Sequence, residues 1–316
     1  MIAAVAVSVV GLVLLARAAD WMVVGAARLA AALRVSPVVI GAIVIGFGTS
    51  APEMLVSGLA AGQDSLDIAV GNIIGSNIAN LTLVLGAAAL LCRLEVGSRT
   101  LRREAPLSAA TVVVFAVAVQ DGLSRIEGVL LVVLIVAVVG TLLYGAGDQS
   151  EVELSAEVEE FLDEVHAHRT STEAVRTLVG LVGTLAGAQA LVWGATTIAS
   201  EVGLEEGFVG LTLVALGTSL PELVTAVAAA RRQEDELIIG NLLGSNMFNS
   251  LAVGATAALV GPGPLADAAL SGFATYLMVG VALAAWMMMA TGRTVVRWEG
   301  VVLLGVYVVA VPSLAL

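Results

Sequence analysis

The segment that decides the fold is GTSAPE at residues 48–53, which recurs as GTSLPE at residues 217–222, 169 positions later (217 − 48). A second segment, GNIIGSNIAN at 71–80, recurs as GNLLGSNMFN at 240–249 with the same offset (240 − 71). Each copy of the first segment places a proline and a glutamate inside an otherwise apolar run. Carboxylates in lipid are costly and by default indicate a functional site. The repeat therefore predicts a duplicated membrane domain with polar groups at its centre.

The composition is that of a membrane protein. Hydrophobic residues make up 59% of the chain, charged residues only 13%, and the mean hydropathy is +1.01, far outside the range of soluble domains. Apolar runs of about 17–25 residues fit the hydrocarbon thickness of a bilayer. We expect ten such spans, at roughly 2–29, 36–62, 68–92, 105–120, 126–145, 175–200, 207–230, 238–260, 268–291 and 299–316. The predicted fold class is an all-α polytopic membrane protein.

The basic residues predict the orientation. All fourteen are arginine, and with both termini outside, twelve of them fall at cytoplasmic ends or loops of the ten spans. Only Arg125 would lie outside, and Arg17 would lie within the first span. Since basic residues in short loops favour the cytoplasm, we expect both termini to be extracellular and the central loop to be cytoplasmic.

The two halves are expected to have opposite orientations, because each holds five spans, an odd number. An all-α fold of ten transmembrane helices in two inverted-topology five-helix repeats is typical of secondary transporters, with a site near the midplane. We expect the first repeat at 1–147, an acidic cytoplasmic linker at 148–173 and the second repeat at 174–316. Apolar positions at helical spacing favour a solvated linker helix over a calcium sensor.

The prolines predict broken helices. Pro52 and Pro221 each lack an N–H and remove the hydrogen bond to the carbonyl four residues back. Broken backbone at membrane depth is tolerated only where it lines a cavity or is buried in protein. A simple proline kink explains the prolines but not the glutamate beside each one. The candidate ligands are therefore Glu53, Thr49, Ser50 and the carbonyl near Gly46 in the first copy, and Glu222, Thr218, Ser219 and Ala215 in the second.

The second segment predicts a polar stripe on a helix. Asn72, Ser76 and Asn80 are spaced i, i+4 and i+8, which places them on one face, and the GxxxG pair Gly71 and Gly75 permits close approach of another backbone. Alone, such a stripe would indicate helix packing. Facing the glutamates, it becomes a wall of oxygen atoms. The expected ligands are Ser76, Asn80, Ser245 and Asn249; the residues expected to hold helices together are Asn72, Asn241, Asn77 and Asn246.

The candidate ligands offer only oxygen atoms, a donor set that selects hard cations. Calcium accepts about six to eight oxygens in flexible geometry, whereas magnesium needs a tight octahedron and keeps its waters. Two ionised glutamates are balanced by one Ca²⁺ or by two Na⁺, and an empty site would carry a buried charge that resists crossing. This asymmetry favours exchange over leak. Protons could also neutralise the pair, so H⁺ is a candidate competitor or substrate.

These segments resemble the α-1 and α-2 repeats of the cation/calcium antiporter superfamily, specifically the prokaryotic sodium/calcium exchangers, and the resemblance extends over all ten spans. It implies a Na⁺/Ca²⁺ antiporter in the plasma membrane of a prokaryote, in which the first and sixth helices slide across the other eight. It also implies a calcium site at Glu53 and Glu222 with the carbonyls of Thr49 and Thr218. The implied sodium sites involve Gly46, Ser50 and Ser76 on one side and Ala215, Ser219 and Ser245 on the other, with Asn80 and Asn249 in the middle.

Several alternatives are separated by the residues present. The relatives often carry aspartate where this chain has Asn249, so we expect a less negative middle position, holding water or a weakly bound ion, without potassium dependence. A Ca²⁺/H⁺ or broader cation antiporter remains the alternative. Broken helices in an inverted repeat argue against a channel. Intramembrane proteases use aspartate pairs as catalysts, whereas the two carboxylates here are glutamates, which argues against a protease.

No nucleotide, flavin or haem motif is present in the sequence, so we expect a transporter rather than an enzyme. No cofactor is expected beyond the transported ions Ca²⁺ and Na⁺. The expected surroundings are the lipid bilayer, with no nucleic acid and no obligate protein partner. The single cysteine, Cys92, excludes a disulfide framework.

Overall fold

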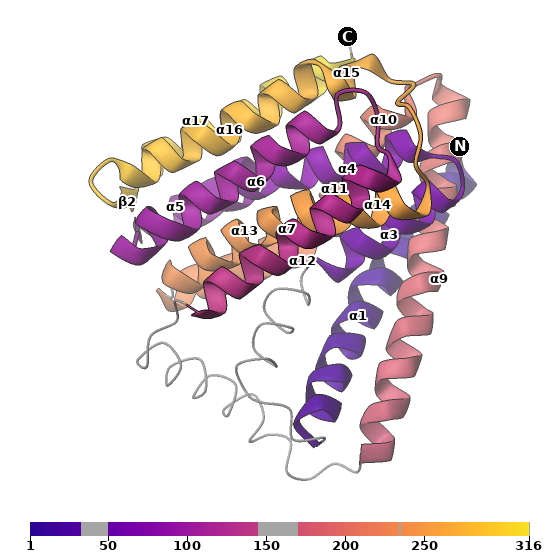
Figure 1. Cartoon of the computed structure of the whole chain (residues 1–316), viewed down its shortest axis with the longest axis horizontal. Helices are drawn as coiled ribbons and strands as arrows, with labels where there is room; N and C mark the ends of the chain where they lie inside the picture. Colours follow the sequence, from indigo (N-terminus) through magenta and orange to yellow (C-terminus); the bar gives the residue numbers. More distant parts are fainter. Residues whose placement is uncertain (33–49, 145–169, 234, 316) are drawn as a thin grey trace.

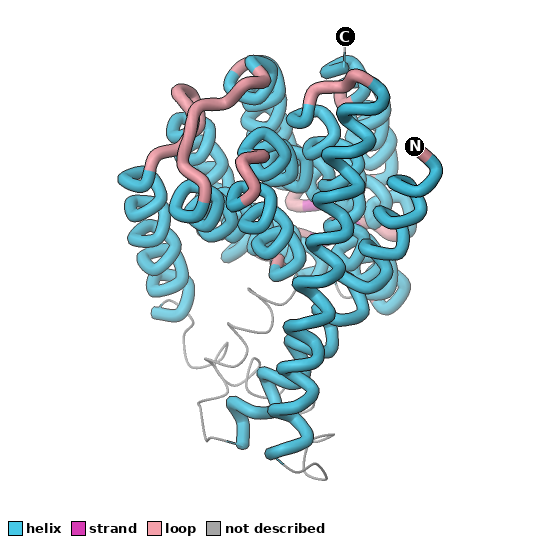
Figure 2. The backbone as a smooth tube through the Cα atoms, turned by 90° about the vertical axis from the view of Figure 1, so that its right-hand side faces the viewer, coloured by secondary structure: helices cyan, strands magenta, loops and turns pink. Residues whose placement is uncertain are grey.

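The computed structural model describes residues 1–32, 50–144, 170–233 and 235–315. The predicted ligands Gly46 and Thr49 and most of the predicted linker lie outside the described residues. Figure 2 shows that the described backbone is almost entirely helical, with short loops joining the helices.

Two long helices, α1 (Ile2–Ala32) and α9 (Thr170–Val202), pack side by side in antiparallel orientation (Figure 1). A β carbon on Gly11 would lie 3.0 Å from the carbonyl oxygen of Gly187, and one on Gly194 would lie 3.0 Å from that of Ala4. Glycines therefore bring the two backbones into direct contact. The two helices occupy equivalent places in the two halves of the chain.

The main helices follow one another in the same order in both halves, whereas β1 follows α5 and β2 follows α16. The first half continues with α3 (Ala51–Gly62), α4 (Leu66–Ala79), η1 (Asn80–Val84), α5 (Leu85–Leu91), β1 (Leu94–Glu95), η2 (Thr100–Glu104), α6 (Ala105–Ala118) and α7 (Arg125–Tyr144). The second half continues with α10 (Glu206–Val209), η3 (Gly210–Val214), α11 (Ala215–Thr218), α12 (Leu220–Arg232), α13 (Asp235–Phe248), η4 (Asn249–Val253), α14 (Gly254–Val260), α15 (Ala268–Ser271), α16 (Phe273–Ala290), β2 (Thr294–Val295), α17 (Arg297–Ala310) and η5 (Pro312–Ala315).

The sequence repeat is also a repeat in structure. The elements α13, η4 and α14 begin and end 169 residues after α4, η1 and α5. Both η1 and η4 are π-helical turns, which are rare and are found mostly as single turns at functional sites. The duplication predicted from the sequence therefore extends to local backbone geometry.

The two halves pack through reciprocal contacts. Helix α3 packs on α14 and α12 on α5, while α5 packs on α17 and α14 on α7. In the same way α6 contacts α13 and α16 contacts α4. Reciprocal pairs of this kind are the signature of two-fold symmetry. The antiparallel two-residue sheet of β1 and β2 adds a further link between the halves.

The centre of the bundle is formed by α4 and α13. All fourteen residues of α4 are buried, and its glycines face the segment α10–η3–α11. A β carbon on Gly75 would overlap the carbonyl oxygen of Leu211 and lie 2.6 Å from the β carbon of Ala215. One on Gly71 would overlap the carbonyl oxygen of Gly207. The close approach expected from the GxxxG pair is confirmed.

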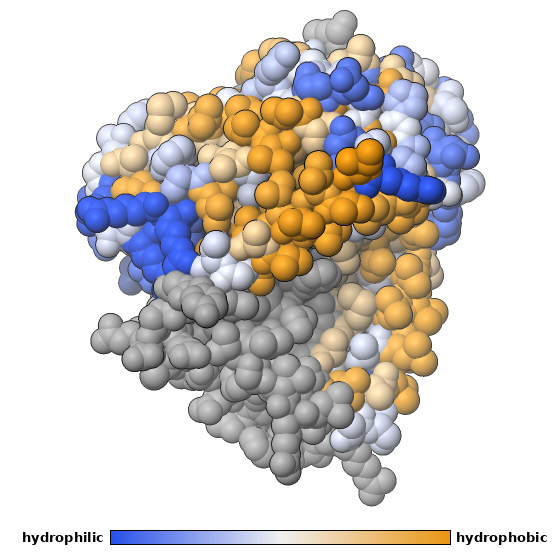
Figure 3. All heavy atoms as spheres, in the orientation of Figure 1, coloured by the Kyte–Doolittle hydropathy of each residue, from blue (hydrophilic) through white to orange (hydrophobic). Residues whose placement is uncertain are grey.

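Apolar side chains cover the outer face of the bundle (Figure 3). On α7 the exposed residues include Val129, Val133 and Val136, and an apolar surface this continuous is typical of contact with lipid. Within the described residues, six helices are long and apolar enough to cross a membrane, or seven if the bent pair Glu206–Thr218 and Leu220–Arg231 counts as one span.

This count is lower than the ten spans expected from the sequence. Two of the expected spans, 105–120 and 299–316, correspond to α6 and α17, which have only fourteen residues each. A third, 36–62, begins outside the described residues and is represented by the twelve residues of α3. The shortfall therefore lies in short helices and in the part of the chain that is not described.

Gly75→Ala is expected to lower the free energy of unfolding by about 1–3 kcal/mol, because the added methyl group has no space against the η3–α11 backbone. A denaturant titration of the protein in detergent micelles would measure this. The matched control is Gly305→Ala on the exposed face of α17, where no described atom lies within 4 Å of the added carbon. Equal effects of the two substitutions would contradict the close packing of α4.

Candidate ion-binding site

Two helices begin at the predicted breaks and carry the glutamates in their first turns. Ser50 precedes α3 and Ser219 precedes α12, and each of these helices has proline at its second position. Proline is well tolerated there because the first N–H groups of a helix have no partner within it. Glu53 and Glu222 follow directly, next to the positive ends of the helix dipoles. Helix α12 is bent by 40° relative to the segment before it.

The two glutamates come together at the centre of the molecule although they belong to different halves. Each is only 1% exposed, and their carboxylates are close enough to interact electrostatically. Among the described residues, none of their four carboxylate oxygens has a hydrogen-bond partner. Burying an ionised carboxylate without a partner is strongly unfavourable. The pair therefore requires a compensating positive charge.

Further oxygen atoms without partners belong to the predicted ligand set. Of the ten predicted ligand residues that the structure describes, seven have a buried polar side-chain atom without a hydrogen-bond partner in the described part: Glu53, Glu222, Ser50, Ser219, Ser76, Asn80 and Asn249. Each of these seven is at most 3% exposed. Polar groups buried without partners are uncommon in folded proteins, and these particular ones form an all-oxygen donor set for a hard cation.

The other three described ligand candidates have a different character. The Thr218 hydroxyl donates to Asn72 Oδ1 at 3.1 Å, and Ser245 is buried in α13. The carbonyl of Ala215 accepts a backbone hydrogen bond from the Ser219 N–H at 3.0 Å, because Pro221 removes only the bond four residues back and the helix keeps its earlier bonds. A carbonyl has a second lone pair, so Ala215 stays a predicted ligand.

Several asparagines of the two polar segments form hydrogen bonds between helices, as expected for Asn72, Asn77 and Asn246. Asn77 Nδ2 donates to Ser250 Oγ at 3.1 Å, and Asn246 Nδ2 donates to the Asn77 carbonyl at 3.3 Å. Asn80 Nδ2 donates to Asn246 Oδ1 at 3.0 Å. This last bond fixes the Asn80 amide and leaves its carbonyl oxygen as the available acceptor.

The π-helical turns were not predicted from the sequence. Two of them, η1 and η4, begin at Asn80 and Asn249, the last members of the two polar stripes. A π turn inserts one extra residue per turn and alters the direction of the side chains that follow. The only signal in the sequence is the recurrence of asparagine at the same place in both repeats. That signal identifies the residue but not the backbone geometry.

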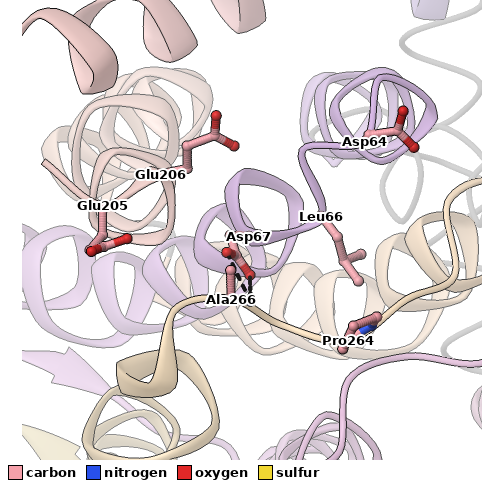
Figure 4. A pocket seen from close by; sticks show the side chains of 7 residues that line it. All are labelled: Asp64, Leu66, Asp67, Glu205, Glu206, Pro264 and Ala266. Carbon is pink, nitrogen blue, oxygen red and sulfur yellow. Dashed lines mark hydrogen bonds between the residues drawn. The ribbon is translucent and has the colours of Figure 1, made fainter. Parts of the chain in front are cut away.

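An acidic pocket of about 220 Å³ lies at the beginning of α4 and α10, close to the ends of α3 and of the loop before α15 (Figure 4). Its acidic residues are Asp64, Asp67, Glu205 and Glu206. Asp67 accepts hydrogen bonds from the backbone N–H groups of Ala266 and Asp267 at 3.1 Å, so it holds that loop in place. Clustered negative charge in a pocket raises the local concentration of cations.

The donor set differs from that of a resident metal centre. No group of three or more His, Cys, Asp or Glu residues within the described part of the chain could hold a metal ion. The central site has two carboxylates, and its remaining ligands are neutral. Such a site can bind a cation without the dense negative charge that would hold it permanently. This property suits an ion that must be released.

Comparisons with known proteins identify the family of the chain. The family model described as "Sodium/calcium exchanger protein" matches residues 3–144 and 173–313. The putative antiporter CaxA of Alkalimonas amylolytica is 40% identical over 314 residues, 98% of this chain and 97% of that protein. The sodium/calcium exchanger MaX1 of Methanosarcina acetivorans is 32% identical, covering 94% of each. The inner membrane protein YrbG of Escherichia coli is 36% identical, covering 90% of each.

A solved structure gives the same result. The sodium-calcium exchanger NCX_Mj, soaked with 2.5 mM Na⁺ and 0.1 mM Ca²⁺, superposes with a TM-score of 0.64 at 31% sequence identity, and the match covers 100% of both chains. The resemblance to prokaryotic cation/calcium antiporters drawn from the two repeated segments is confirmed. The chain belongs to the sodium/calcium exchanger protein family.

Proposed function

We propose that this protein is a secondary active antiporter that exchanges Na⁺ for Ca²⁺ by alternating access at a site between its two repeats. The observation that carries the proposal is the pair Glu53 and Glu222, buried together with all four carboxylate oxygens lacking partners among the described residues. The neutral oxygens around them complete a donor set for hard cations.

The charge of the site explains why transport would be coupled. The two ionised glutamates carry a charge of −2, which one Ca²⁺ or two Na⁺ balance. With neither cargo bound, the uncompensated charge would have to move through a low-dielectric interior, which is costly. The change between the two access states is therefore slow when no ion is bound, and transport of one ion depends on transport of the other in the opposite direction.

The ligand assignment follows the sequence and remains part of the proposal. Ca²⁺ is bound by Glu53 and Glu222 with the carbonyls of Thr49 and Thr218. Na⁺ is bound beside it, by Gly46, Ser50 and Ser76 on one side and by Ala215, Ser219 and Ser245 on the other. Asn80 and Asn249 line the middle, and protons compete for the carboxylates.

The membrane topology is also part of the proposal. We infer ten spans in two inverted repeats, with both termini extracellular and the acidic linker cytoplasmic. The equivalent helices α1 and α9 run antiparallel, which supports opposite orientations of the two repeats. The distribution of arginines supports the direction.

The alternation is suggested by an asymmetry in otherwise reciprocal packing. Helix α9 packs along α3, and Gln63 at the end of α3 donates to Gln189 Oε1 on α9 at 2.6 Å. Within the described residues, α1 makes no comparable contact with α12. The positions equivalent to Gln189 and Gln63 are Asp20 and Arg232. Asp20 is exposed and makes no hydrogen bond or ion pair in the described part.

Two nearly equivalent halves can exchange their arrangements, and this exchange would open the other side of the membrane. In the second state α1 would pack along α12, and an Asp20–Arg232 ion pair would take the place of the amide pair. One gate is then closed by neutral amides and the other by opposite charges.

Uptake of radioactive calcium tests the proposed function. Proteoliposomes loaded with sodium and diluted into sodium-free buffer are expected to accumulate Ca²⁺, whereas potassium-loaded vesicles are not. Glu53→Gln or Glu222→Gln is expected to abolish this uptake, because one carboxylate cannot balance a divalent ion. The control Asp121→Asn changes an exposed carboxylate in the turn before α7 and should leave uptake unchanged.

The other outcomes identify the alternatives. Uptake driven by a pH gradient alone would assign the protein to the proton-coupled antiporters. Uptake without any counter-ion gradient would indicate a channel. Wild-type exchange by either glutamate variant would refute the proposed site.

Asn249→Asp is expected to retain exchange but to change its sodium dependence or its sensitivity to protons, because it adds a third negative charge to the site. Sodium and pH titrations of the same uptake assay measure the effect. Unchanged titrations would show that Asn249 does not face the transported ions.

Cysteine cross-linking tests the alternation. In a Cys92→Ser background, the pairs Gln63→Cys with Gln189→Cys and Asp20→Cys with Arg232→Cys are each expected to react with a short bifunctional thiol reagent. Each cross-link should stop exchange, and reduction should restore it. The control pair Gln63→Cys with Arg232→Cys joins opposite ends of the bundle and should not react. Failure of the 20/232 pair alone would argue against exchange of the two arrangements.

A further inference from the structure

Asn72 lies outside the proposed ligand set but connects three helices beside it. It is completely buried in α4. Its Nδ2 donates to Ser57 Oγ on α3 at 3.0 Å, and its Oδ1 accepts from Thr218 Oγ1 on α11 at 3.1 Å. Ser57 and Asn72 belong to the first repeat and Thr218 to the second. The chain of hydrogen bonds therefore ends at the hydroxyl of Thr218 in the opposite repeat, the residue whose carbonyl is a proposed calcium ligand.

The direction of each hydrogen bond in this chain is determined by Ser57. Its hydroxyl donates to the carbonyl oxygen of Ala69 at 3.3 Å, and a hydroxyl has only one proton to donate. Toward Asn72, Ser57 can therefore only accept. The amide must present its NH₂ group to Ser57 and its oxygen to Thr218. Ser57 thus sets an orientation that the shape of the asparagine side chain alone does not determine.

The orientation of the amide decides what the Thr218 hydroxyl can do. Thr218 also has one proton, and its possible acceptors are Asn72 Oδ1 at 3.1 Å, the Ala215 carbonyl at 3.4 Å and the nearby Glu53 carboxylate. Donation to Glu53 would satisfy that carboxylate in the absence of any cation. Donation to Asn72 leaves the Glu53 oxygens without partners, as observed. It also leaves the lone pairs of Thr218 Oγ1 free to face a cation.

We propose that Asn72, oriented by Ser57, is a positioning residue that turns the Thr218 proton away from Glu53, so that Thr218 and Glu53 both act as acceptors toward the bound cation. The proposal rests on the cation site proposed above. It adds a reason why the Glu53 oxygens lack hydrogen-bond partners, because the neighbouring Thr218 hydroxyl already donates to Asn72.

The second repeat lacks one member of this chain. The equivalents of Asn72 and Thr218 are Asn241 and Thr49, but the equivalent of Ser57 is Ala226. A methyl group cannot accept a hydrogen bond, so the serine member of the chain has no equivalent in the second repeat. A serine–asparagine pair of this kind therefore belongs to the first repeat alone. The two halves of the site are expected to contribute unequally to cation binding.

A purely structural role for the same hydrogen bonds predicts something different. If Ser57 and Asn72 only hold helices together, then removing the Ser57 hydroxyl lowers stability whether or not Thr218 has a hydroxyl. If they act through Thr218, the effect on cation binding disappears once the Thr218 hydroxyl is gone. A double-mutant cycle separates the two.

The experiment measures equilibrium binding of radioactive calcium to purified protein in detergent for four forms: unmodified, Ser57→Ala, Thr218→Val and the double variant. Ser57→Ala is expected to weaken Ca²⁺ binding about fivefold, the effect of one hydrogen bond. In the Thr218→Val background the same change should have no effect on Ca²⁺ binding. Equal effects of Ser57→Ala in both backgrounds would overturn the proposal.

The control variant is Ser108→Ala. It removes another buried hydroxyl that joins two helices, since Ser108 Oγ donates to the Leu243 carbonyl at 3.2 Å, but Leu243 is not a proposed ligand. It should lower the melting temperature without changing Ca²⁺ affinity. If the unmodified protein binds no Ca²⁺, the proposed function fails instead. The same cycle, followed by thermal shift with Na⁺, then tests the ordering of Thr218 independently.

Discussion

The structure is organised around two carboxylates that are buried without partners. Glu53 and Glu222 come from separate halves of the chain, and their oxygens lack hydrogen-bond partners in the described part. In an apolar interior this arrangement is unfavourable by itself, so the surrounding helices must be stable enough to hold it. The glycine contacts of α4, the asparagine ties between α4 and α13, and the reciprocal packing of the two halves provide that support. The same instability would be relieved by a bound cation or by protonation of the carboxylates.

The backbone places the candidate ligands with few interruptions of its helices. Each proline lies where a helix begins, so it ends the preceding segment without leaving a broken bond inside α3 or α12. The π turns η1 and η4 begin at Asn80 and Asn249, at the end of each polar stripe. Rigid elements therefore place nearly every candidate ligand, and a site built in this way keeps its geometry while the helices around it move.

The sequence predicted what depends on spacing and composition. The 169-residue repeat, the close approach at Gly75 and the burial of the oxygen-bearing residues all follow from local patterns, and the structure confirms them. The π turns, the hydrogen bond of the Ala215 carbonyl and the Ser57–Asn72–Thr218 chain depend on contacts between distant segments, which no local pattern specifies. The ten spans stay a prediction, since α6 and α17 are too short to be counted by length and part of the chain lies outside the described residues. Gly46 and Thr49 lie outside the described residues.

The differences between the two halves are as informative as their similarity. If the repeats were identical, the two arrangements that open opposite sides would have equal free energy, and ion gradients alone would decide between them. The two halves differ at most aligned positions, and three of these differences bear on the site or on the proposed gates. Ser57 corresponds to Ala226, Gln63 to Arg232 and Gln189 to Asp20. The first difference removes the hydroxyl that orients an asparagine amide on one side of the proposed site. The other two make one proposed gate a pair of neutral amides and the other a pair of opposite charges. A change that makes these positions equivalent should therefore shift the resting state while leaving the glutamate site intact.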